Sequence, residues 1–329
     1  MVVLSRRGLF SVAGVAGLAV GLAACGGADD GGGEKDWSFV DDRGVTAEAA
    51  GTPSRIVAFS GAAAVLVDHG LADRIAGVFG DTSGGDTALL GDLDLDTVTV
   101  LGDQWGQFDL ERYAELEPDL LITDTYMDDN LWYIPDDNRD KILELAPAIA
   151  IGVANKPLPV PIGRYIDLAL ALGADPEAVR LRDAQQRFAA ASQAVRDAVA
   201  ARPGLRVLAC SAAADAFYVS NPEVSADLSY LRELGVDVVV PERTEAGGFF
   251  ENLSWEYADR YPADLVILDS RGSALPPEAL AAKPVWQRLP AVVAGQVAPW
   301  HPVFRFSHAG TAPLLEEFAA TLARTEKVT

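Results

Sequence analysis

The stretch FDLERYAELEPDLLIT, at Phe108–Thr123, recurs as LSWEYADRYPADLVIL at Leu253–Leu268. The two copies align without a gap, so that Glu111 corresponds to Glu256. Each copy predicts a short helix with a capping residue at its start, then a turn and a buried strand. Each glutamate falls in the first helical turn, where the helix dipole favours an anion. The chain is therefore expected to contain two similar α/β halves.

Other landmarks recur in the same order in both halves. SRIVAFS at Ser54–Ser60 corresponds to LRVLACS at Leu205–Ser211, and DHGLADRIAGV at Asp68–Val78 corresponds to RELGVDVVV at Arg232–Val240. Strand patterns alternate with helix patterns, which indicates parallel sheets with helices on both faces. Two such halves usually enclose a cleft, and open α/β sheets bind ligands beyond the carboxyl ends of their strands.

A helical segment separates the halves. Pro161–Ala200 contains no strand-like run, and Asp175 followed by Pro176 is typical of a helix start. The Ala-rich helix expected there, of about 25 residues, would span roughly 38 Å. The predicted fold class is α/β, with two doubly wound Rossmann-like lobes joined by one long spine helix. The predicted domains are a lipoprotein signal peptide (1–24), a lipidated tether with an edge segment that contains a short hairpin (25–53), an N-terminal α/β lobe (54–157), the helical spine (158–203) and a C-terminal α/β lobe (204–329).

The N-terminus is typical of an exported lipoprotein. Arg6 and Arg7 precede the apolar stretch Leu9–Val20, and Leu22–Cys25 forms a lipobox that is cut before Cys25. The thiol would then carry diacylglycerol, whose two acyl chains are enough for stable anchoring. The double arginine also resembles a twin-arginine export motif. The alternative is a transmembrane helix, for which the apolar stretch is short and rich in glycine. We expect a protein anchored to the outer face of the cell membrane.

Composition argues against several classes of function. The chain has 329 residues, half of them hydrophobic, which is enough for two domains. Its formal charge of −22 argues against nucleic acid as a partner, because phosphate binding needs a basic surface. No nucleophile elbow, dinucleotide fingerprint or P-loop occurs, so no enzyme activity and no catalytic residue are predicted. Ser60 is the only serine placed like a nucleophile, and we interpret it as a helix cap.

Cysteine and histidine do not indicate a metal centre. Cys210 lies in an apolar strand pattern and is expected to be a buried, unpaired thiol. His69 is expected to cap a helix C-terminus, while His301 and His308 precede the last helix. A zinc or manganese site needs about four converging ligands, so no metal and no cofactor are predicted. His301 as an axial ligand of haem or cobalamin stays open.

From Ser54 onward the chain resembles the substrate-binding proteins of iron-siderophore and vitamin B12 ABC importers. The resemblance rests on the paired repeats, the helical spine and KPVWQRLPAVVAGQV at Lys283–Val297, which is similar to the family signature W-x-x-L-P-A-V-x-x-G-x-V. It implies a monomeric receptor that captures a ferric siderophore and delivers it to an ABC permease dimer with its ATPase. Cobalamin or haem is the alternative ligand, and an exported α/β hydrolase-like enzyme is a further alternative. Trp286, in the signature, is expected to be structural.

The resemblance also gives the two glutamates a role. Members of this family present one glutamate per lobe to basic residues of the permease, and these correspond to Glu111 and Glu256. Two carboxylates related by pseudo-symmetry could meet a symmetric pair of arginines, one from each permease subunit. The other interpretation is that both are merely favourable first-turn residues.

Aromatic and basic residues follow the predicted strands. A ferric siderophore already has its iron wrapped by hydroxamate or catecholate oxygens, so the protein needs guanidinium groups and aromatic faces rather than metal ligands. Each aromatic residue could equally belong to a core. Acidic pairs at Asp128–Asp129 and Asp136–Asp137 would favour a cationic ligand, which points to hydroxamates of the ferrioxamine type. The predicted ligand-binding residues are Trp105, Tyr126, Trp132, Tyr218, Phe249, Arg271, Trp300 and Arg305.

Overall fold

The computed structural model describes residues 37–82, 87–127 and 130–329. Cys25, the lipobox and the tether lie outside the described residues, as does the acidic pair at 128–129. Residues 35–329 form one compact unit, and the description concerns that unit. Within the described ranges, no helix is long and apolar enough to cross a membrane.

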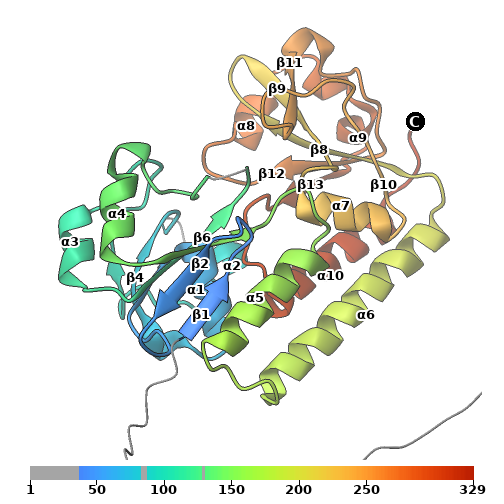
Figure 1. Ribbon diagram of the computed structural model, residues 1–329. Coiled ribbons are helices and arrows are strands. Elements are labelled where there is room, and N and C mark those ends of the chain that lie inside the picture. Colours follow the sequence, from blue (N-terminus) through green and yellow to red (C-terminus); the bar gives the residue numbers. More distant parts are fainter. Residues whose placement is uncertain (1–36, 83–86, 128–129) are drawn as a thin grey trace, which may run out of the picture. The chain divides into compact units, whose positions relative to one another are not determined.

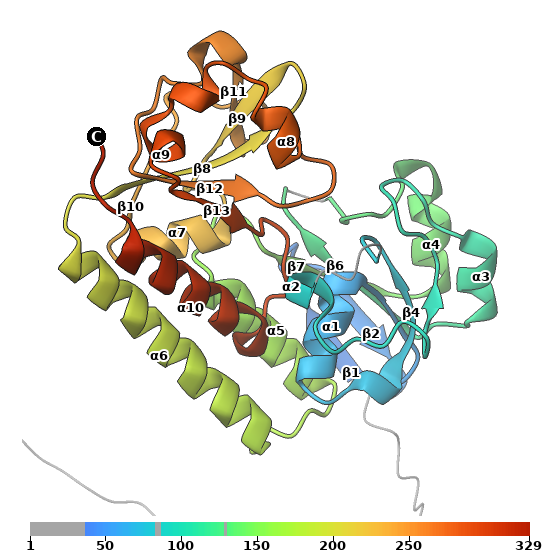
Figure 2. The ribbon, with the colours of Figure 1, turned by 180° about the vertical axis from the view of Figure 1, so that it is seen from behind.

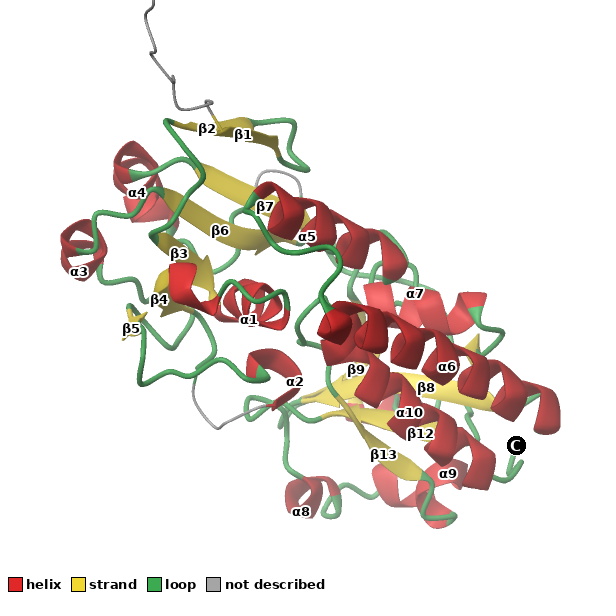
Figure 3. Cartoon of the chain, turned by 90° about the horizontal axis from the view of Figure 1, so that it is seen from below, coloured by secondary structure: helices red, strands yellow, loops and turns green. Residues whose placement is uncertain are grey.

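Five parallel strands form the first sheet, in the order β5–β4–β3–β6–β7 (Figure 1). The strands are β3 (Ile56–Phe59), β4 (Ile75–Phe79), β5 (Thr99–Val100), β6 (Leu120–Thr125) and β7 (Ala148–Gly152). All positions of β3, β6 and β7 are buried, which explains the unbroken apolar sequences of β3 and β7 and the apolar first half of β6. Figure 3 shows α1 on one side of this sheet and α3 and α4 on the other. These helices, with α2, are α1 (Ser60–Asp68), α2 (Thr87–Leu90), α3 (Leu110–Glu115) and α4 (Arg139–Leu145).

The second sheet is mixed. Its order is β11–β9–β8–β12–β13, and the short β10 also pairs with β8. Strands β9 and β11 run antiparallel to their neighbours, whereas β8, β10, β12 and β13 are parallel. Its strands are β8 (Arg206–Ala212), β9 (Ala216–Ser220), β10 (Asp237–Val238), β11 (Phe250–Ser254), β12 (Leu265–Asp269) and β13 (Val297–Trp300). Its helices are α7 (Ala226–Glu233), α8 (Pro277–Leu280), α9 (Pro290–Val293) and α10 (His308–Arg324).

The internal repeat predicted from the sequence is real in the structure. Asp119 and Asp264, which align in the two copies, each bind the backbone at the start of the first strand of their own sheet. Asp119 Oδ1 accepts from the amide of Arg55 at 3.0 Å, and Asp264 Oδ2 accepts from the amide of Arg206 at 2.9 Å. The strand register is equivalent as well, with Ile56 opposite Leu120 and Val207 opposite Leu265. The two-lobed α/β architecture is thereby confirmed.

The two copies differ in their helices. In the first copy, α3 is capped as expected, because Asp109 accepts a hydrogen bond of 3.0 Å from the amide of Arg112. The helix expected after Ser254 is wrong. Strand β11 extends to Ser254 because it pairs with β9, so only a 3₁₀ turn, Trp255–Tyr257, follows. The second glutamate therefore lies on a single turn rather than on an α-helix.

Two helices connect the lobes, α5 (Pro159–Ala171) and α6 (Val179–Ala201). Gly173, with φ +89°, separates them. The predicted helix start at Pro176 is wrong by three residues, because the Asp175 carboxylate closes a turn onto the amide of Glu177 at 2.9 Å before α6 begins. Helix α6, 23 residues long, lies beside α10 in both Figure 1 and Figure 2.

The expected edge hairpin is present as β1 (Trp37–Val40) and β2 (Thr46–Ala49). Its turn is fixed to the edge strand β7 by two carboxylates. Asp41 Oδ2 accepts from the amide of Ala150 at 3.0 Å, and Asp42 Oδ2 accepts from the amide of Gly152 at 2.8 Å. The hairpin thus lies next to the carboxyl end of the first sheet.

Candidate functional site

The carboxyl ends of four strands deliver side chains to one cavity between the lobes. Tyr126 follows β6 and Val153 follows β7, while Arg271 comes two residues after β12 and Trp300 ends β13. This is the placement that open α/β sheets give their ligand sites. The cavity, here called the cleft cavity, has a volume of about 300 Å³.

The floor of the cleft cavity is made by backbone pairing between the lobes. Ala154, after β7, forms an isolated bridge with Ser225, just before α7. The amide of Asn155 donates to the carbonyl of Val224 at 2.8 Å. Residues 154–155 belong to the first lobe and residues 224–225 to the second, so these contacts join the two lobes at the base of the cavity.

Aromatic rings from both lobes face each other across the cleft cavity. Trp132 packs against Tyr126 with ring centroids 4.4 Å apart, and Tyr126 is 6.1 Å from Phe249 of the other lobe. Trp105 lies against Trp132 at 4.8 Å and is 59% exposed, so it extends the aromatic surface toward solvent. The indole nitrogen of Trp132 is buried and has no partner among the described residues, which leaves a donor in the wall.

Arg271 is the cation of the cleft cavity, and a buried carboxylate orients it. Its Nη2 lies 2.6 Å from Asp269 Oδ2 and its Nε lies 3.0 Å from Asp269 Oδ1. Asp269 has 1% of its side chain exposed and also accepts from Ser211 Oγ at 2.7 Å. The remaining nitrogen, Nη1, makes no hydrogen bond within the described chain. A guanidinium held in this way can offer that nitrogen to a ligand oxygen without losing its own support.

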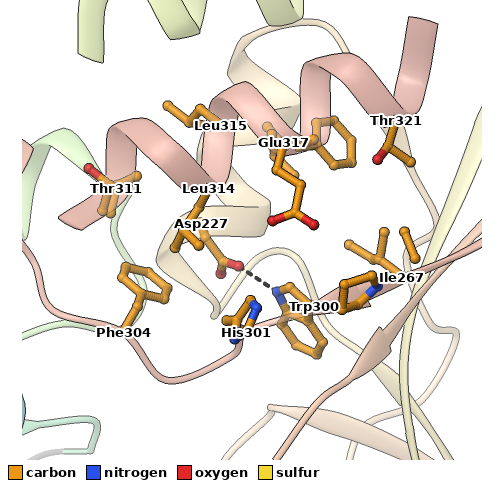
Figure 4. A pocket seen from close by; sticks show the side chains of 15 residues that line it. Asp227, Ile267, Trp300, His301, Phe304, Thr311, Leu314, Leu315, Glu317 and Thr321 are labelled. Atoms are coloured by element: carbon orange, nitrogen blue, oxygen red, sulfur yellow. Dashed lines mark hydrogen bonds between the residues drawn. The ribbon is translucent and has the colours of Figure 1, made fainter. Parts of the chain in front are cut away.

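Asp227, in the first turn of α7, is the carboxylate that lines the cleft cavity. It accepts a hydrogen bond of 2.7 Å from the indole nitrogen of Trp300 (Figure 4). Burial raises the pKa of Asp227 to about 6. Trp300 also borders a smaller apolar cavity of about 70 Å³ behind it, beside Leu314 and Leu315 of α10 (Figure 4). The Asp227–Trp300 pair is thus the wall between the two cavities.

Asp124 occupies the position in the first lobe that Asp269 occupies in the second. The hydroxyl of Tyr165, on α5, donates to it, and burial raises the pKa of Asp124 to about 7. The equivalent carboxylates therefore have different partners, a tyrosine in one lobe and the arginine of the cleft cavity in the other. This difference makes the second lobe the source of the cleft's cation.

Five of the eight predicted ligand-binding residues line the cleft cavity: Tyr126, Trp132, Phe249, Arg271 and Trp300. Trp105 and Tyr218 lie one layer away, the latter against Phe250 with ring centroids 6.1 Å apart. The structure does not bring Arg305 to the cavity. Its Nε donates to Asp68 Oδ2, in α1, at 2.8 Å, so Arg305 links the lobes instead.

Several residues that line the cleft cavity were not predicted, notably Asp227, Met127 and the floor at 224–226. The available signal for Asp227 was its position in the first turn of a helix that follows strand β9 after five residues. The floor gave no signal, because its pairing joins segments from different lobes.

The other candidate residues have structural positions. His69 caps the C-terminus of α1, as expected, with Nδ1 2.8 Å from the carbonyl of Val65. Trp286 is buried against Phe217, with ring centroids 6.4 Å apart. Cys210 is buried and unpaired.

Ser60 is fully buried, and its hydroxyl has no hydrogen-bond partner in the part of the chain that the structure describes. It is the first residue of α1 and does not cap the helix, so that expectation is wrong. His301 lies beside the smaller cavity, with Nδ1 3.2 Å from Ser270 Oγ. Over residues 37–82, 87–127 and 130–329, no group of three or more His, Cys, Asp or Glu could hold a metal ion.

Comparisons with known proteins identify the family and the fold. The family model for periplasmic binding proteins matches residues 56–303. The ferric-siderophore receptor protein DesE from Streptomyces coelicolor is 43% identical, with a TM-score of 0.83 over 89% of this chain and 100% of its own. The petrobactin-binding protein YclQ from Bacillus subtilis (16% identity, TM-score 0.67) covers 88% of this chain and 100% of its own, and shares the fold. So does the siderophore periplasmic binding protein from the fuscachelin gene cluster of Thermobifida fusca (21% identity, TM-score 0.58, covering 82% and 96%). No curated protein matches the chain.

Proposed function

Because the chain belongs to the family of periplasmic binding proteins, we propose that it captures a ferric siderophore of the hydroxamate type and delivers it to an ABC importer. The observation that carries the proposal is the cleft cavity, in which Arg271 and facing aromatic rings from two lobes surround about 300 Å³. That volume lies at the lower end of the range of small-molecule sites. The relationship to a ferric-siderophore receptor at 43% identity supports the same ligand class.

The chemistry of the cavity suits an iron complex that is already fully coordinated. Such a complex presents chelating oxygens and organic arms, and it needs no metal ligand from the protein. The free Nη1 of Arg271 and the indole nitrogen of Trp132 are donors for the oxygens. The rings of Tyr126 and Phe249 supply apolar faces for the arms.

The proposal includes the setting in which the protein works. Cys25 would carry diacylglycerol and hold a monomer at the outer face of the cell membrane, after removal of the signal peptide. The partner would be a permease dimer with its ATPase, which Glu111 and Glu256 would dock.

A panel of ligands tests this function by quenching of tryptophan fluorescence in the purified lipoprotein. Trp132 and Trp300 line the cleft cavity, so a bound iron complex should quench them. We expect ferric trihydroxamates to bind with a Kd of about 1 μM or tighter, equivalent to roughly 8 kcal/mol. Cobalamin and haem should produce no response at the same concentrations. Tight binding of either one, without a response to trihydroxamates, would contradict the proposal, as would turnover of an ester with no retained ligand.

Replacing Arg271 by glutamine should weaken binding of a ferric trihydroxamate by about 10- to 100-fold, the value of one charged hydrogen bond. Asp269 keeps Ser211 Oγ at 2.7 Å and the backbone amide of residue 271 at 2.9 Å, so the fold should survive. Arg260→Gln is the matched control. Arg260 is also half-exposed and pairs with a buried carboxylate, Glu251, but lies outside the cleft cavity. An unchanged Kd for Arg271→Gln would remove this arginine from the site.

A further inference from the structure

A second cavity adjoins the cleft cavity and is different in character. It has a volume of about 550 Å³ and shares Tyr126, Met127 and Gly247 with the cleft cavity. Its remaining wall comes from the hairpin turn and from the segment after β7, with Asp42, Asn155 and Lys156 among the lining residues. We call it the polar cavity. Because the two cavities share three residues, one ligand can occupy both.

The carboxylate of Asp42 accepts hydrogen bonds from two groups other than Lys156. Its Oδ1 accepts from Arg164 Nε at 2.7 Å, and its Oδ2 accepts from the amide of Gly152 at 2.8 Å. Lys156 Nζ lies further away, 3.5 Å from Asp42 Oδ2. The ammonium can therefore turn to another acceptor while Asp42 keeps two hydrogen bonds.

Lys156 is also the accessible cation of the polar cavity. Arg43, the other one, has 7% of its side chain exposed and is bonded to Asp41 Oδ2 at 2.7 Å and to a backbone carbonyl. The side chain of Lys156 is 35% exposed. Arg43 pairs with Asp41, and Arg164 pairs with both Asp42 and Asp167, so Lys156 is the cation of this cluster with the longest ion pair, 3.5 Å to Asp42 Oδ2.

The backbone around Lys156 is arranged to leave room for its ammonium. A Cβ atom on Gly152 would lie 2.8 Å from Lys156 Nζ, so the ammonium lies over the end of β7 in the space that the glycine leaves open. Asn155, next to it, has φ +58° and is exposed, and its side chain makes no hydrogen bond within the described chain. Both side chains can offer donors to a ligand in the polar cavity.

We propose that the polar cavity is a subsite for the free arm of a linear ligand, that Lys156 favours an arm ending in a carboxylate, and that Asn155 adds a hydrogen bond. The subsite rests on the proposed function, because the iron-binding part of the ligand would occupy the cleft cavity. The arm would pass between Met127 of one lobe and Gly247 of the other, whose added Cβ would lie 3.4 Å from Met127 Sδ. A macrocyclic ligand, which has no free arm, would leave the subsite unused.

A matched ligand series tests the subsite. One linear ferric trihydroxamate is prepared with its terminal amine succinylated, acetylated or free, which gives arms of negative, zero and positive charge on the same core. We expect the succinylated form to bind the wild-type protein about fivefold more tightly than the acetylated form, the upper value for one ion pair with a half-exposed group. Lys156→Gln should abolish that difference and leave the Kd of the acetylated form unchanged. Lys156→Glu should reverse it.

Lys141→Gln is the matched control, because Lys141 is exposed on α4 and does not line the polar cavity. It should keep the roughly fivefold preference for the succinylated form. Equal Kd values for all three ligands on the wild-type protein would overturn the subsite and leave the proposed function intact. Tighter binding of the free amine than of the acetylated form would overturn the subsite too, because it would show that the cavity prefers a cationic arm. Failure of all three ligands to bind would overturn both proposals.

Discussion

Replacing Glu111 and Glu256 together by alanine is expected to abolish uptake of a ferric trihydroxamate while leaving its Kd unchanged. Both side chains are exposed, and neither makes an ion pair with any described residue. They occupy equivalent positions in the repeat, one in each lobe. A permease dimer can offer one basic residue per subunit to such a pair, so the loss of both contacts should remove docking without touching the cleft cavity. Each single variant should retain part of the uptake.

Two quantities are measured for each variant: the accumulation of radioactive iron by cells that carry it, and the Kd of the purified protein for the ferric trihydroxamate. Glu115→Ala combined with Asp259→Ala is the matched control, because it removes two exposed carboxylates close to the same two turns. The control should transport normally. A weakened Kd in the Glu111 and Glu256 double variant would place the glutamates in ligand recognition, and normal uptake would refute their role in docking.

The repeat was predictable because its signals are local. Asp119 and Asp264 each bind a backbone amide at the start of a neighbouring strand, and the apolar strands read directly as buried parallel strands. The second copy departs from the prediction because β11 pairs with β9, and that pairing depends on tertiary structure. The local preference for a helix near Ser254 stabilises the chain less than the hydrogen bonds that complete the pairing of β11 with β9.

The residues of the site were predictable where they lie at or just after the carboxyl end of a strand. Tyr126, Arg271 and Trp300 were found because they come at or after the carboxyl ends of β6, β12 and β13. Arg305 met the same criterion and lies elsewhere, because its partner Asp68 is 237 residues away in the sequence and no local pattern announces it. Lys156 was missed for the opposite reason, since its cavity is completed by the hairpin turn at Asp42, which comes from outside the predicted lobe.

The ion pair between Arg305 and Asp68 is buried and links the two lobes. Arg305 Nε lies 2.8 Å from Asp68 Oδ2, and the two side chains are 11% and 7% exposed. Asp68 also accepts from the hydroxyl of Ser307. We expect Asp68→Ala to lower the free energy of unfolding by about 3–5 kcal/mol, because it breaks a buried ion pair and removes the acceptor of the Ser307 hydroxyl. The corresponding fall in Tm, measured by circular dichroism, is on the order of 5–10 °C.

Two further variants test whether the loss of stability in Asp68→Ala comes from the burial of the ion pair. Arg187 and Glu316 pair at 2.7 Å between α6 and α10, but their side chains are 54% and 42% exposed, so Arg187→Ala should cost less than about 1 kcal/mol. Asp68→Leu with Arg305→Met removes both charges and should recover much of the loss. Because Phe304 and Phe306, which line the cleft cavity, flank Arg305, Asp68→Ala should also weaken ligand binding at temperatures well below the Tm of the variant. A variant as stable as the wild type would show that the Arg305–Asp68 pair does not stabilise the fold.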